Sequence, residues 1–128
     1  MLLTHKLSIP IYNQTIHFVF GDSEEVQDYL TQIYNGEFQI PAYVDGCCFH
    51  RIPESWIWMD TSATVASFMH ELSHAIFYIM DDVGLEVSDQ EAFCYLMSYI
   101  VEQCESIFAI QMGPIKQASE QEDEHPSS

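Results

Sequence analysis

Two histidines and a glutamate near the middle of the chain have the spacing of a metal site. His70 and His74 are four positions apart, and residues at that spacing project from the same face of an α-helix, one turn apart. Two imidazoles placed in this way can converge on one ion, and imidazole is a common zinc ligand. Glu71 follows His70 directly, about 100° around a helix, where its carboxylate can take a proton from water at the metal's open position. The segment therefore predicts a zinc site with Glu71 as general base.

The residues around this motif predict that it lies on a long helix. Apolar side chains recur at spacings of 4, 3, 4 and 3 on the side opposite the histidines, at Val65, Met69, Leu72, Ile76 and Ile79. The helix should begin after Thr61 or Ser62 and end at Gly84. Two packed histidines beside a solvated glutamate are the competing interpretation. The apolar stripe on the opposite side favours the metal site.

Tight zinc binding needs a third protein ligand, and five acidic residues follow the motif. They are Asp81, Asp82, Glu86, Asp89 and Glu91. Glu91 is favoured because it lies in the first turn of a second predicted helix. If that helix runs antiparallel to the first, its first turn comes back beside the metal. The alternative is that Ser88 and Glu91 form a capping box and Glu91 only caps its own helix. Asp81 suits an outer role better than ligation, and paired carboxylates at a helix C-terminus are unfavourable enough to need an explanation.

The stretch from Trp56 to Glu102 resembles the HExxH zinc metallopeptidases of the glutamate-zincin (gluzincin-like) type, especially the short bacterial and phage immunity-region metallopeptidases. The likeness rests on three segments, namely the apolar strand 56–59 ending in Asp60, the helix carrying residues 70–74, and the helix opening at Glu91. It implies that His70, His74 and Glu91 bind zinc and that Glu71 is the catalytic acid/base. It also implies that an edge strand holds the peptide substrate, either 38–44 or 56–59. Many such peptidases have glycine at the position of Ser73, and the residues before Trp56 match no element of the family.

The remaining patterns predict an α+β fold: a small, mostly antiparallel sheet packed on the zincin-type metal-site helix, plus a second long helix. Strands are expected within 6–20, around a turn at Asn13-Gln14, and over 38–44 and 55–59. Helices are expected from Asp22 or Ser23 to Asn35 and from Ser88 to about Phe108. Residues 1–117 form one domain, and 118–128 should be an acidic, disordered tail.

Composition excludes several classes of protein. The 20 acidic and 3 basic residues give a formal charge of -17, which repels phosphate backbones and argues against direct nucleic-acid binding. No apolar stretch is long enough to span a membrane, and no secretory signal is recognisable at the N-terminus. The four cysteines read as reduced thiols of a cytoplasmic protein, in the host cytoplasm if a phage encodes it.

The leading interpretation is a zinc metallopeptidase that cleaves a peptide or protein substrate. The alternative is a non-catalytic, zinc-containing binding protein whose acidic surface engages a basic or DNA-binding partner. The intact Glu71 argues against that alternative, because a structural site needs no base. An oxyanion partner could come from any of four residues: His50, Tyr43, Tyr95 or Tyr99. Cys47-Cys48-x-His50 fits no common zinc module.

Overall fold

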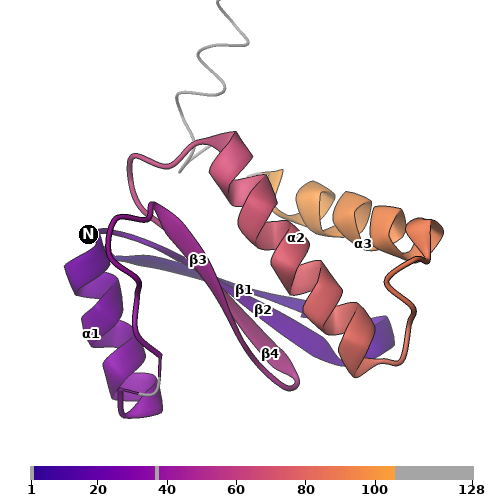
Figure 1. The fold of residues 1–128 in the computed structure, drawn as a ribbon, viewed down its shortest axis with the longest axis horizontal. Helices are drawn as coiled ribbons and strands as arrows, with labels where there is room; N and C mark the ends of the chain where they lie inside the picture. Colours follow the sequence, from indigo (N-terminus) through magenta and orange to yellow (C-terminus); the bar gives the residue numbers. More distant parts are fainter. Residues whose placement is uncertain (1, 37, 106–128) are drawn as a thin grey trace, which may run out of the picture.

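The computed structural model describes residues 2–36 and 38–105. Four strands form one sheet in the order β1-β2-β4-β3, and three α-helices pack on it (Figure 1). In chain order the strands and α-helices are β1 (Leu3–Ile9), β2 (Gln14–Phe20), α1 (Ser23–Tyr34), β3 (Gly46–Arg51), β4 (Glu54–Met59), α2 (Val65–Asp82) and α3 (Gln90–Gln103). This is the predicted α+β class. Among the described residues, no helix combines the length and the apolar character needed to cross a bilayer.

The sheet is antiparallel at both edges and parallel in the centre. β1 pairs antiparallel with β2, and β3 pairs antiparallel with β4. β2 and β4 run parallel, with Phe18 opposite Ile57. Parallel neighbours need a crossover connection, and here α1, the loop after it and β3 all lie between the two strands in the chain. The prediction of a mostly antiparallel sheet is confirmed, whereas the parallel pairing of β2 with β4 was not predicted.

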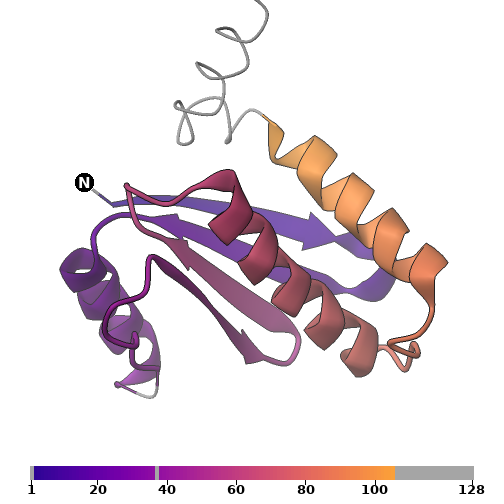
Figure 2. The same cartoon turned by 45° about the horizontal axis from the view of Figure 1, so that its top comes forward.

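Side chains on the two faces of the sheet belong to two separate cores. Phe18 and Ile57 point toward α2 and α3, where they pack with Leu72 and Leu96. Residues next to them in the strands point the other way, since successive side chains of a strand alternate between faces. These pack against α1, in a cluster that includes Val19, Val26, Leu30, Trp56 and Trp58. Figure 2 shows the resulting layers, with α2 and α3 on one face and α1 on the other.

The predicted strand 38–44 does not form, and the segment is irregular. The side chain of Gln27 takes up backbone groups that a strand partner would need: its amide nitrogen donates to the Phe38 carbonyl over 3.0 Å, and its oxygen accepts from Ile40 N over 2.7 Å. Pro41 has no amide hydrogen to donate, and Tyr43 has a positive φ of 65°. β-branched and aromatic composition was therefore misleading, because local side-chain bonding and backbone conformation decide this segment.

A strand that was not predicted, β3, lies at the edge of the sheet. It covers Gly46–Arg51 and forms a hairpin with β4 through Ile52 and Pro53. Because β3 is the edge strand and β4 lies inside the sheet, neither segment proposed for substrate binding, 38–44 or 56–59, is the edge strand next to α2. β3 is.

The helices follow the sequence pattern with shifted ends. α1 is capped by Asp22, whose carboxylate accepts from Glu25 N over 2.9 Å, as predicted. α2 begins at Val65, later than expected, because Asp60 accepts from Ser62 N and Thr64 provides the cap. It ends at Asp82, just before Gly84. α3 ends at Gln103. Residues 106–108 of the predicted helix lie outside the described residues, and so does the predicted tail 118–128.

Candidate metal centre and its cleft

α2 presents two imidazoles on the face opposite its buried stripe. Phe68, Leu72 and Ile76 of α2 are almost fully buried, whereas His70 and His74 are exposed. The Nε2 atoms of the two histidines lie 3.3 Å apart, and their rings are inclined at 81°. Glu71 completes a group whose ligand atoms all lie within 4.8 Å of one another. This group could hold a metal ion.

The separation of the two histidine nitrogens can be compared with the geometry of zinc. Zinc–nitrogen bonds are about 2.0 to 2.1 Å long and structural zinc is tetrahedral, which places two coordinating nitrogens about 3.3 to 3.4 Å apart. The observed 3.3 Å has this value. The same contact meets the limits of an N–H···N hydrogen bond, but it is longer than the usual 2.9 to 3.0 Å. The two histidine nitrogens therefore have the separation of two zinc ligands.

Glu71 lies between the histidines and the edge strand β3. Burial raises the pKa of its carboxyl group, and the nearby Asp45 raises it further, while His70 and His74 act in the opposite direction. A carboxylate with a raised pKa holds a proton more strongly, which is what a general base at neutral pH requires.

Gly46 allows β3 to approach β4 closely beneath Glu71. A Cβ atom at this position would lie 2.9 Å from the Trp58 carbonyl oxygen and 2.9 Å from Met59 Sδ, both closer than carbon atoms normally approach. It would also lie 3.5 Å from Cγ of Glu71. Gly46 therefore lies directly beneath the side chain of Glu71.

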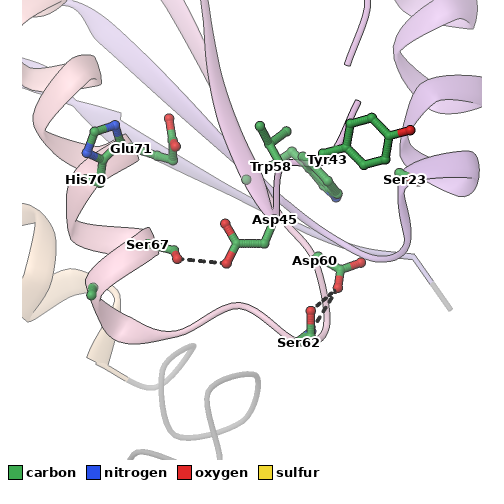
Figure 3. Close-up of a pocket in the computed structure, with 12 residues that line it drawn as sticks. Ser23, Tyr43, Asp45, Trp58, Asp60, Ser62, Ser67, His70 and Glu71 are labelled. Carbon is green, nitrogen blue, oxygen red and sulfur yellow. Dashed lines mark hydrogen bonds between the residues drawn. The ribbon is translucent and has the colours of Figure 1, made fainter. Parts of the chain in front are cut away.

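An open cleft of about 890 Å³ adjoins the candidate metal centre. It lies between the start of α2, the end of β4 and the loop before β3 (Figure 3). His70 and Glu71 line it on one side, with Asp45 and Tyr43 opposite. The Glu71 side chain is therefore accessible from the cleft.

Glu91 lies in the first turn of α3, as predicted, but the structure does not bring it into the group formed by residues 70, 71 and 74. Its carboxylate is exposed. The capping-box alternative is wrong by one position: Asp89 is the N-cap, and its carboxylate accepts from Ala92 N over 3.0 Å. Glu91 is then the second helical residue, whereas a capping box uses the third.

The other acidic candidates include one whose partner is now visible. Asp82 is buried, with 4% of its side chain exposed, and one of its oxygens lies 2.8 Å from Nε2 of His50. The other ring nitrogen of His50 lies 2.8 Å from Ser55 Oγ, and its ring stacks on Tyr78. This pairing explains why an acidic residue is tolerated at the C-terminus of α2. It joins residues 32 positions apart, so no local sequence pattern signals it.

Of the four candidate oxyanion partners, only Tyr43 lines this cleft. His50 is held between Ser55 and Asp82, and Tyr95 and Tyr99 line a separate groove against Ile9 and Pro10.

The vicinal cysteines do not form a second metal site. Cys47 packs in the core beneath α1 and Cys48 in the core beneath α2. Within the described part of the chain, residues 70, 71 and 74 make up the one group of this kind.

Comparison of the chain with protein-family models, with curated proteins and with solved structures gives no match.

Proposed function

We propose that the protein is a zinc-dependent peptide hydrolase. One observation carries the proposal: the Nε2 atoms of His70 and His74 are separated by 3.3 Å, the spacing of two zinc ligands, with a glutamate carboxylate beside them. A purely structural site has no need of a half-buried, basic carboxylate facing an open cleft. Glu71 meets that description.

In this proposal the residues divide the work. His70 and His74 hold the ion, which would acidify a water molecule and polarise the scissile carbonyl. Glu71 takes the proton from the water and later passes it to the leaving amine nitrogen. Glu91 is the proposed third ligand. Two residues after it, Phe93 packs on Phe77 of α2, with ring centroids 5.1 Å apart, and Phe77 follows His74 by less than a turn. That contact joins the start of α3 to α2 three positions beyond His74.

Substrate binding is assigned to the cleft and the adjoining strand. β3 pairs with β4 along one side, and no described strand pairs with its other side. An extended peptide can add to such an edge through main-chain hydrogen bonds. We therefore propose a peptide or unfolded protein segment as the substrate. The four unpaired thiols, at positions 47, 48, 94 and 104, support a cytoplasmic location.

The first experiment measures metal in purified protein by mass spectrometry of the ion. We expect about one zinc per chain, lost in His70→Ala and in His74→Ala. Glu91→Ala should weaken zinc binding much more than it lowers the stability of the metal-free fold. The matched control is Asp89→Ala, which removes the helix cap and should cost about 0.5 to 2 kcal/mol of stability without changing zinc affinity. Wild-type protein that stays folded without metal and is not stabilised by added zinc would contradict the proposal.

The second experiment asks whether Glu71 acts as a base. Zinc-loaded wild-type protein and Glu71→Gln are incubated with a mixture of quenched fluorescent peptides. Glu71→Gln should retain zinc and fold but lose at least about 100-fold in rate. Glu102→Gln, the same change at an exposed position on α3, is the control and should behave as wild type. If Glu71→Gln cleaves at the wild-type rate, the base is wrongly assigned. If wild-type protein binds zinc but cleaves nothing, the binding-protein alternative gains.

A further inference from the structure

The cleft beside Glu71 is lined by negative charge. Three carboxylates contribute, those of Asp45, Asp60 and Glu71, and no lysine or arginine lines it. The whole chain has three basic residues. Of the two within the described ranges, Lys6 lies in β1, and Arg51 lies over the ring of Tyr34, 5.8 Å from its centroid. Neither lines the cleft.

The carboxylates of Asp45 and Asp60 are held in place by the surrounding structure. Ser67 Oγ donates to Asp45 Oδ2 over 2.8 Å, and Asp60 N donates to the Asp45 carbonyl oxygen, also over 2.8 Å. Asp60 in turn accepts from the backbone and the hydroxyl group of Ser62. No described residue donates a hydrogen bond to the second oxygen of Asp45, Oδ1. Figure 3 shows this carboxylate in the space between α2 and the loop that carries Tyr43.

A bound metal ion would not neutralise these two aspartates. A divalent ion held by the histidines is offset by the carboxylates of Glu91 and Glu71. The N-terminus of α2 also borders the cleft through Ala66 and Ser67, but a helix end carries only about half a positive charge. Asp45 and Asp60 therefore keep the region beside the metal centre negative.

We propose that the substrate of this site carries a lysine or arginine side chain next to the scissile bond, and that Asp45, assisted by Asp60, selects it. This inference rests on the proposed hydrolase function and names its substrate class. Charge-assisted hydrogen bonds to an aspartate already fixed by Ser67 lose little freedom on binding. Tyr43, fully exposed, also lines the cleft and offers an aromatic face to the bound peptide.

The test measures peptide binding to zinc-loaded Glu71→Gln, so that no cleavage intervenes. The probes are acetylated, amidated, dye-labelled alanine-rich octapeptides in which each position in turn is lysine or norleucine. Norleucine keeps the aliphatic chain and removes the charge. At one position or at neighbouring ones, lysine should bind about fivefold more tightly in low salt, and high salt should reduce the difference.

Two further substitutions in the same background identify the residue responsible. Asp45→Asn keeps an oxygen for Ser67 and should bring the lysine preference close to unity. Asp28→Asn makes the same change on α1, at an exposed position away from the cleft, and should leave the preference intact.

A lysine preference that is absent, or that Asp45→Asn and Asp28→Asn affect alike, would overturn the inference. Failure of this inference is distinguishable from failure of the proposed function. If wild-type protein cleaves lysine and norleucine peptides equally well, the hydrolase stands and the selectivity is wrong. If it neither binds zinc nor cleaves any peptide, the hydrolase is wrong, and the inference falls with it.

Discussion

Two histidine–carboxylate pairs in this protein have nearly the same N···O separation and should contribute very differently to stability. His50 lies 2.8 Å from Asp82, and His17 lies 2.9 Å from Glu54. Each imidazole also stacks on an aromatic ring, His50 on Tyr78 with centroids 4.6 Å apart and His17 on Trp56 with centroids 4.5 Å apart. The pairs differ in burial. The exposed fractions are 11% and 4% for His50 and Asp82, against 19% and 41% for His17 and Glu54.

Burial determines the expected energies. Removing one member of a buried pair leaves the other charge without a partner in a region that water does not reach, which typically costs about 3 to 5 kcal/mol. Exposed pairs contribute about 0 to 1 kcal/mol, because water replaces the lost partner. We therefore expect His50→Ala to lower the free energy of unfolding by about 3 kcal/mol, a large part of the 5 to 15 kcal/mol typical of a domain. His17→Ala should cost about 1 kcal/mol, mostly from the lost stacking.

Double-mutant cycles in urea unfolding separate the pair from the stacking. Each cycle compares the wild type, the histidine→Ala variant, the acid→Ala variant and the double variant, so that the stacking loss cancels. The coupling energy should be about 2 kcal/mol for His50 with Asp82 and below about 0.5 kcal/mol for His17 with Glu54. Equal coupling energies in the two cycles would refute the argument from burial.

Two other predictions follow from the packing around β3. Gly46→Ala should lower the free energy of unfolding by about 1 to 3 kcal/mol, because its methyl group would collide with the Trp58 carbonyl oxygen; a variant as stable as the wild type in urea would show that β3 has room to move. Burial raises the pKa of three thiols to about 12, those of Cys47, Cys48 and Cys104. Near pH 8 only about one in 10⁴ of each is thiolate, so iodoacetamide should modify the exposed Cys94 first and the other three only after unfolding, as peptide mass spectrometry would show; simultaneous labelling would contradict this.

Elements governed by neighbouring residues could be predicted from the sequence. The apolar stripe of α2 fixes both its buried face and the opposite face that carries His70 and His74. Those histidines and Glu71 come together within one helical turn, so helical spacing alone predicts their proximity. The capping aspartate of α1 was recognisable for the same reason, since its bond reaches only three residues ahead.

Features that depend on distant residues could not be predicted. The segment 38–44 has strand-like composition, but Gln27, on the preceding helix, bonds its backbone instead. The parallel pairing of β2 with β4 depends on where the whole intervening chain packs. Asp45 reaches the cleft only because β3 folds under α2, and its bond to Ser67 spans 22 positions. The residues proposed to do chemistry were therefore visible in the sequence, and those proposed to select a substrate were not.

The alternation of side chains along β4 has a consequence for how the molecule melts. Ile57 and Met59 belong to the core under α2 and α3, while Trp56 and Trp58 belong to the core under α1. One strand of six residues thus carries both cores, and neither can loosen without displacing the backbone that supports the other. Because both cores share β4, we expect neither core to unfold while the other stays folded. We therefore expect α1, on the far face from the candidate metal centre, to unfold together with α2 in a single cooperative unit.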